Sequence, residues 1–167
     1  GGLLGILLVA RSPSPASPPV PQREDVRSFA SPTGGFRFSY PASWVLTERG
    51  EVGVVERSGG GAVVSVGPAP EGDPGRAARR LLSAIRRTYA DVFVTGIAPL
   101  PSGDRTAVVV GGTARNRHGA LLRFRLLVVG SGGRNHAIAI FADRAASGAA
   151  WREAELVVRS FSAIEGP

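Results

Sequence analysis

Hydrophobic and polar residues alternate in the first half of the chain in the manner of short β-strands. Phe36–Tyr40 reads Phe-Arg-Phe-Ser-Tyr, which places three aromatic side chains on one face of a strand. Further strands are predicted at 44–48, 52–57 and 62–66. Gly59–Gly61 separates the last two and predicts a hairpin turn, because glycine adopts positive φ at little cost.

The pattern then changes to the helical repeat. Asp73-Pro74 combines a capping carboxylate with a proline suited to the first helical position, so a helix is predicted to begin there. Its apolar face comprises Ala78, Leu81, Leu82, Ile85 and Tyr89. At about 100° per residue, the opposite face carries Arg76, Arg80 and Arg87, with Arg79 and Arg86 on the flank.

The second half returns to strands and ends in a helix. Strands are predicted at 92–97, 105–115, 121–129 and 135–141, with a turn region over 99–104 and hairpin turns at 116–119 and 130–133. The last three strands form a predicted meander, in which Arg123 and Arg125 lie on the face opposite Leu122, Phe124, Leu126 and Val128. Gly111-Gly112 indicates a bulge or a close approach of backbones.

A final helix is predicted from Ser147, with Ala150, Trp151, Ala154, Val157, Val158 and Phe161 as its apolar stripe. The order strands, helix, strands, helix predicts an α+β sandwich with an antiparallel sheet. The predicted domain covers residues 34–165, an ordinary size for one fold.

Two segments before this domain differ from it in composition. Residues 11–33 hold six of the 13 prolines and no periodic apolar residues, so they are predicted to form an extended linker. Residues 1–10 are apolar and uncharged in their side chains, but ten helical residues span only about 15 Å. We expect a partial membrane anchor whose start lies upstream; a signal-peptide remnant and a buried segment are the alternatives.

The residue types that the chain lacks exclude several kinds of chemistry. It has no Cys, and all 20 basic residues are Arg, so Lys is absent too. Schiff-base chemistry, thiol nucleophiles and cysteine-ligated metals are therefore excluded. The two histidines cannot supply a three-histidine metal site, and no paired-carboxylate or nucleophile motif is present. We predict no catalytic residues, no metal site and no cofactor.

The net charge of +7 and the pI of about 11.4 raise the hypothesis of a nucleic-acid partner, because clustered Arg releases counterions from phosphate. The candidate binding residues are those of the first helix, Arg76, Arg79, Arg80, Arg86 and Arg87, and those of the meander, Arg115, Arg117, Arg123 and Arg125. A solvated helix face and charge protection of an edge strand explain the same residues without binding. Nucleic acid is not expected, because the helix lacks interleaved aromatic residues; an anionic lipid surface remains a possible partner. His118 is expected to be exposed in a turn, and His136 to be buried beside Ile138.

The start of the domain resembles a known family. Gly35-Phe36-Arg37-Phe38-Ser39-Tyr40-Pro41-Ala42-Ser43-Trp44 is similar to the G-[FY]-x-[FY]-x-Y-P-x-x-W start of PsbP-like domains, and Val157-Val158-Arg159-Ser160-Phe161 resembles their closing segment. The resemblance implies an α/β/α sandwich with a central antiparallel sheet and two main helices. It also implies a family made up mainly of binding proteins, including photosystem accessory subunits and cell-envelope proteins of high-GC bacteria.

The sequence therefore predicts a non-catalytic, extracytoplasmic domain that is tethered to a membrane and binds a protein partner. An accessory subunit of a larger membrane complex, such as a photosystem or reaction centre, is one alternative, and a small-ligand or anion-binding envelope protein is another. The lipid-anchoring cysteine common in envelope members is absent, so residues 1–10 would have to provide the anchor.

Overall fold

The computed structural model describes residues 25–102, 105–146 and 148–164. The predicted anchor, residues 1–10, and residues 11–24 of the predicted linker lie outside the described residues. No helix in the described part of the chain is long and apolar enough to cross a membrane.

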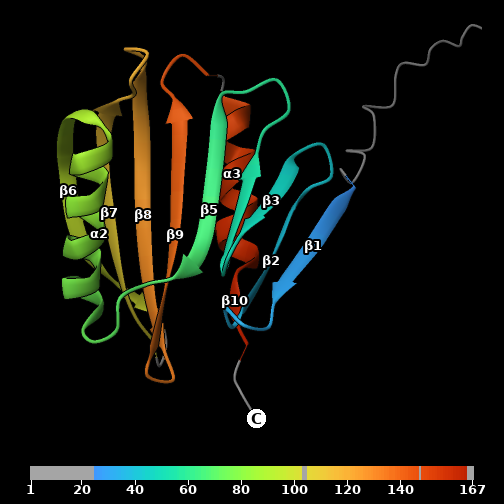
Figure 1. Ribbon diagram of the computed structural model, residues 1–167, viewed down its shortest axis with the longest axis vertical. Helices are drawn as coiled ribbons and strands as arrows, with labels where there is room; N and C mark the ends of the chain where they lie inside the picture. The colour runs from blue at the N-terminus through green and yellow to red at the C-terminus, as the bar shows by residue number, and fades with distance from the viewer. Residues whose placement is uncertain (1–24, 103–104, 147, 165–167) are drawn as a thin grey trace, which may run out of the picture.

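A large antiparallel sheet forms the centre of the domain (Figure 1). Its strands are β3 (Val45–Arg49), β4 (Val52–Glu56), β5 (Ala62–Pro68), β6 (Ala90–Ser102), β7 (Arg105–Arg115), β8 (Leu121–Ser131) and β9 (Arg134–Asp143). They lie in the order β3-β4-β5-β9-β8-β7-β6. The predicted meander is confirmed and is one strand longer than expected, because β6 pairs with the outer side of β7.

The strand β6 differs from its prediction. Residues 99–104 were expected to be a turn region, but β6 continues to Ser102, and Pro99 and Pro101 pair with β7. Prolines are tolerated here because β6 is an edge strand. The two prolines are two residues apart, so their backbone nitrogens point the same way, toward the outer edge where no ladder hydrogen bond is made.

A smaller sheet packs beside the large one. It consists of β1 (Val26–Ser31), β2 (Phe36–Pro41) and β10 (Ser162–Ala163), in the order β1-β2-β10. Here the predicted linker boundary at Thr33 is wrong, because Val26–Ser31 pairs along its whole length with β2. Most β1 side chains are exposed, so this strand lacks the apolar alternation that would have indicated it.

The first helix, α2 (Pro74–Thr88), begins where the sequence predicts. The Asp73 carboxylate accepts a hydrogen bond from the backbone N–H of Arg76 at 3.0 Å, and Pro74 occupies the first turn. The predicted apolar face is confirmed: Ala78 and Leu82 are buried, and Leu81, Ile85 and Tyr89 pack against them.

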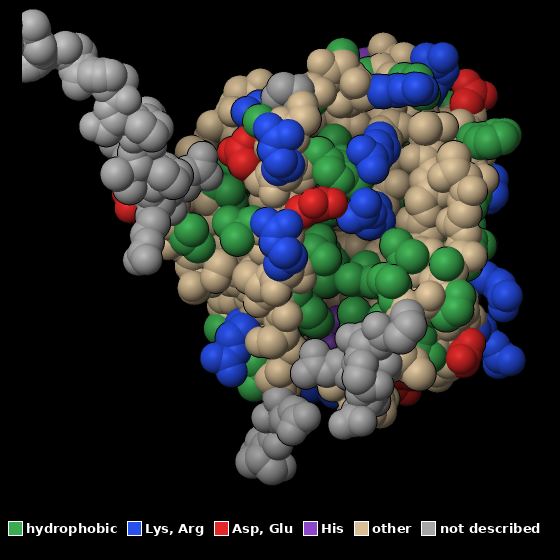
Figure 2. All heavy atoms as spheres, turned by 180° about the vertical axis from the view of Figure 1, so that it is seen from behind, with side chains coloured by type: hydrophobic (Ala, Val, Ile, Leu, Met, Phe, Trp, Pro, Cys, Tyr) green, Lys and Arg blue, Asp and Glu red, His purple; other side chains and the backbone are tan. Residues whose placement is uncertain are grey.

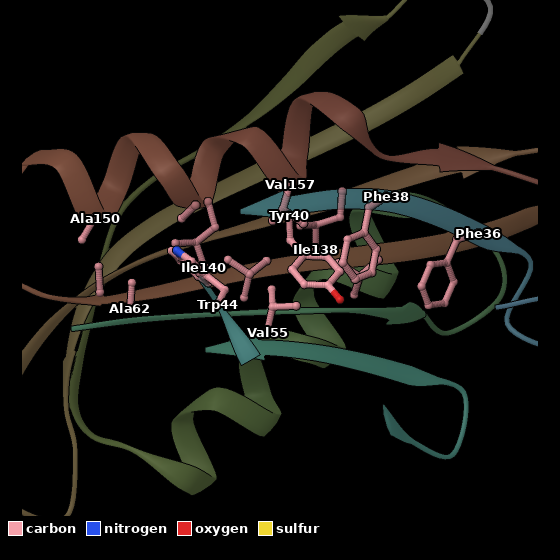
Figure 3. Close-up of a cluster of buried hydrophobic side chains, with 14 residues drawn as sticks. Phe36, Phe38, Tyr40, Trp44, Val55, Ala62, Ile138, Ile140, Ala150 and Val157 are labelled. Carbon is pink, nitrogen blue, oxygen red and sulfur yellow. The ribbon is translucent and has the colours of Figure 1, made fainter. Parts of the chain in front are cut away.

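The second helix, α3 (Gly148–Ser160), lies on the opposite face of the large sheet from α2 (Figure 1). Alternate residues of β9 show this arrangement, because Ile138 and Ile140 pack in the α3 core while Ala139 packs in the α2 core. Figure 3 shows Ala150 and Val157 pointing from α3 toward the sheet. The aromatic residues of β2, Phe36, Phe38 and Tyr40, complete this core, as their alternation predicts. The α+β sandwich is therefore confirmed.

The Gly111-Gly112 pair on β7 was predicted to mark a bulge or a close approach, and the structure shows both. A Cβ at Gly112 would lie 2.4 Å from the carbonyl oxygen of Phe93 and 2.7 Å from the Phe124 ring. The bulges themselves lie in the partner strand β6, where the register shifts between Val94 and Gly96 and, earlier, between Ala90 and Phe93.

Candidate functional site

A groove lies on the α3 side of the large sheet, between α3 and the outer strands. It has a volume of about 710 Å³, within the roughly 300–1,000 Å³ typical of ligand sites. Its floor comes from β6, β7 and β8, which α3 does not cover because this helix packs over β5 and β9. Figure 2 views this face and shows basic side chains gathered around an acidic one, beside hydrophobic surface.

The strand register brings the polar floor residues together. Thr113 pairs directly with Arg123, and Gly111 pairs with Arg125, so these four residues project to the same side of the sheet. Phe124 and Leu126 alternate with them and pack under α2. The predicted separation of arginines from apolar residues on this strand is therefore confirmed.

Arg123 and Arg125 meet Trp151 of α3. The Arg123 guanidinium carbon lies 3.9 Å from the centroid of the Trp151 ring, and that of Arg125 lies 5.2 Å away. Both are within cation–π range, which extends to about 6 Å. The indole therefore fixes where the two guanidiniums lie.

Glu155 joins this cluster from the next turn of α3. Its Oε1 accepts hydrogen bonds from Arg125 Nη1 at 2.9 Å and from Trp151 Nε1 at 3.0 Å, and Arg159 lies 3.8 Å from its other oxygen. Burial alone would raise the pKa of Glu155. The hydrogen bonds from Arg125 and Trp151 and the charges of Arg125 and Arg159 outweigh burial, so the pKa lies below its ordinary value of 4.5.

Arg123 differs from Arg125 in its charge partners. Within the described ranges, no carboxylate oxygen lies within 4.0 Å of the Arg123 guanidinium, whose side chain is exposed in the groove. Arg144 also lines the groove, together with one carboxylate, Asp143. The groove therefore carries a net positive charge, and Arg123 presents hydrogen-bond donors into it.

Comparisons with known proteins identify the fold. No protein-family model matches the chain, and no curated protein sequence matches it. Among solved structures, the cyanobacterial PsbP (CyanoP) of Synechocystis superposes with a TM-score of 0.65 at 11% identity, covering 84% of this chain and 93% of that one. The chain has a PsbP-like fold.

Two other solved structures show the same likeness. A Bacteroides thetaiotaomicron protein matches with a TM-score of 0.57 at 17% identity, covering 83% of this chain and 48% of its own. A protein of unknown function from Pseudomonas aeruginosa matches with a TM-score of 0.52 at 13% identity, covering 85% of this chain and 98% of its own. These likenesses establish the PsbP-like fold and leave function to be argued from the groove.

The remaining predicted arginines of the meander lie apart from the groove of this PsbP-like domain. Arg115 turns to Asp91, with its Nε 3.4 Å from the carboxylate, and also donates to the carbonyl oxygen of Gly119 at 3.1 Å. Arg117 is exposed in the following turn. Of the four meander arginines predicted as binding residues, Arg123 and Arg125 line the groove and Arg115 and Arg117 do not. The binding role of all four stays a prediction.

The α2 arginines of the PsbP-like domain form a solvent-facing surface. Arg76, Arg79, Arg80, Arg86 and Arg87 are all exposed. Arg86 donates to the carbonyl oxygen of Val92 at 3.3 Å, which links the end of α2 to β6. The helix face predicted from the sequence is confirmed, and its role in binding stays a prediction.

The two histidines lie outside the groove. His118 is exposed in the turn after β7, as predicted. His136 is 2% exposed and donates from Nε2 to the carbonyl oxygen of Gly34 at 2.9 Å, between the Phe36 and Phe161 rings. Its predicted packing role is confirmed. In the described part of the chain, no group of three or more His, Asp or Glu residues is placed to hold a metal ion.

Two groove residues, Trp151 and Arg144, were not predicted as binding residues. The helical pattern places Trp151 in the apolar stripe of the last helix, and no motif marks Arg144. The contact between Trp151 and Glu155 could have been predicted from the sequence, because the two residues are one helical turn apart. The contact of Trp151 with Arg123 could not, because it depends on α3 lying beside β8, which no local pattern shows.

Proposed function

We propose that the chain is a non-catalytic binding domain whose groove on the α3 side receives an acidic region of a protein partner. One observation carries the proposal: Arg123 is held against Trp151 in a groove of ligand size, with no carboxylate of the described residues within 4.0 Å. A guanidinium held in place loses less conformational entropy on binding a carboxylate than a mobile one does.

The absence of catalysis is part of the same proposal. The described residues lining the groove include Thr95, Thr113 and Asp143, but neither histidine. A hydroxyl nucleophile needs an adjacent base, and among the described residues no histidine lines the groove with these threonines. The lining therefore supports binding without chemical conversion.

The setting that we propose is extracytoplasmic, with residues 1–10 as the membrane tether and the proline-rich segment after them as the spacer. Support comes from the layout of the sequence, an apolar segment followed by prolines and then a folded domain. Deleting residues 1–10 should move the protein from the membrane fraction to the soluble fraction of its source cells. Retention in the membrane fraction would contradict the tether.

The binding proposal is tested by reversing charge at the groove. Arg123→Glu should abolish cross-linking of the full chain to its partner in membranes of the source organism, whereas Arg87→Glu on α2 is the matched control, because it makes the same change on an exposed helix face. Equal loss in both variants would indicate general electrostatic attraction. Loss only with Arg87→Glu would move the binding site to α2.

A further inference from the structure

Gly111, on the floor of the groove, faces a second glycine on the neighbouring edge strand. Gly96 of β6 pairs directly with Gly111 of β7, and Gly111 pairs with Arg125 on its other side. Since cross-strand partners project to the same face, the missing side chains of both glycines would point to the α3 side. Gly111 itself lines the groove.

Neither glycine is required by the fold in the way that Gly112 is. Neither has a positive φ, and a Cβ on Gly96 would have no heavy atom within 4 Å. A Cβ on Gly111 would meet only Thr95 Oγ1, at 3.5 Å, an ordinary contact distance. Glycine inside a strand weakens it and often marks a place where a ligand or another backbone approaches closely.

We infer that the groove binds an extended acidic peptide segment, whose main chain lies over Gly111 and toward the neighbouring Gly96 of the edge strand, and whose Asp or Glu carboxylate meets Arg123. This inference rests on the proposed function and specifies the chemistry of the ligand. A bare backbone floor suits a flat extended chain, because the closest approach is to main-chain atoms. The neighbouring row, Phe93, Thr113 and Arg123, then meets the side chains of the bound segment.

The groove contains charges of both signs, with arginine in excess. Asp143 in the wall and Glu155 behind Arg125 offset much of the positive charge of Arg123, Arg125 and Arg144. The excess of positive charge attracts the carboxylate of an acidic peptide. Nucleic-acid stacking is disfavoured, because Arg123 already lies over the Trp151 ring.

The test is calorimetric titration of the full chain with capped eight-residue peptides. One peptide carries two Glu residues two positions apart in a Thr/Val background, and the control carries Gln at both positions. We expect the Glu peptide to bind at least tenfold more tightly than the Gln peptide. Arg123→Gln should weaken binding of the Glu peptide at least tenfold, whereas Arg49→Gln, at an exposed position outside the groove, should leave it unchanged.

The glycine floor is tested with Gly111→Val, which fills the groove with a residue that strands favour. We expect an equal or higher melting temperature and at least a tenfold loss of Glu-peptide binding. The inference would be overturned if the Gly111→Val variant bound the Glu peptide as tightly as the unmodified chain does. It would also be overturned if the Glu and Gln peptides bound with equal affinity. Binding of inorganic phosphate or sodium acetate as tightly as the Glu peptide would also overturn it, since a small-anion site would explain that result. If no peptide binds while cross-linking to the partner still depends on Arg123, the inference fails and the proposed function stands.

Discussion

The indole Nε1 of Trp151 donates a hydrogen bond over 3.0 Å to Oε1 of Glu155, one turn further along α3. The same oxygen accepts from Arg125 of β8, so the helix and the sheet share one carboxylate. This arrangement fixes the indole ring that Arg123 lies against. Glu155 therefore positions the groove arginines.

Glu155 should make the stability of the domain depend on acid pH. Its folded pKa is lowered, so the stabilisation that its ionised form provides is present above the ordinary value of 4.5 and is lost as the pH falls through the lowered folded value. Glu155→Gln should cost up to about 1 kcal/mol at pH 7, since the ion pair is partly exposed. Urea unfolding of both proteins between pH 7 and pH 3 should show this difference shrinking at acid pH. A constant difference would contradict the assignment.

Adjacent glycines on β7 should respond differently to the same substitution. Gly112→Ala should lower the free energy of unfolding by about 1–3 kcal/mol, because its Cβ would overlap the Phe93 carbonyl oxygen and the Phe124 ring. Gly111→Ala, with only an ordinary contact, should change it by less than about 0.5 kcal/mol or increase it. Chemical denaturation of the two variants measures the difference. A similar loss of stability in both variants would contradict the prediction, because it would show that close contact at Gly112 is not what limits alanine in β7.

The two histidines should have unequal effects on stability. His136→Ala should cost about 2–5 kcal/mol, because it leaves a cavity beside Phe36 and Phe161 and leaves the Gly34 carbonyl without its donor. His118→Ala, at an exposed turn position, should change stability by no more than about 0.5 kcal/mol. Melting temperatures of both variants distinguish these effects, and a minor effect at His136 would contradict its packing role.

The strand β1 should contribute measurably to the stability of the domain. A chain that starts at Asp25 keeps all of β1, whereas one that starts at Gly34, the predicted domain start, loses it. The shorter chain should be at least about 2 kcal/mol less stable, because Phe29 packs against Phe36 and Phe38 with ring centroids 6.1 and 5.5 Å apart. Denaturant unfolding of the two chains measures the difference. Equal free energies of unfolding for the two chains would instead support the predicted linker boundary at Thr33.

The elements with strong local signals could be predicted from the sequence. The alternation of Phe36–Tyr40 and the Asp73-Pro74 cap each depend on residues close together in the chain, and both appear as expected. Val26–Ser31 could not be predicted in this way, since it pairs on one side only and leaves most of its side chains in solvent. Its strand conformation depends on β2 rather than on its own composition.

The candidate site was predicted only in part, for a similar reason. That Arg123 and Arg125 share a face follows from the two-residue period of a strand. Their meeting with Trp151, and the diversion of Arg115 to Asp91, depend on how distant elements pack. The bare glycine floor depends on the register between β6 and β7, which is shifted by bulges that the sequence does not show.

The prolines of β6 also affect how copies of the chain behave toward one another. Phe93, Ile97 and Leu100 of this edge strand are exposed by 68%, 51% and 43%, and such a strand is ordinarily a template for fibril growth. Pro99 and Pro101 remove two amide donors from its outer side, so an incoming strand finds an interrupted ladder. The prolines therefore oppose strand-to-strand polymerisation through β6, although this edge strand exposes apolar side chains.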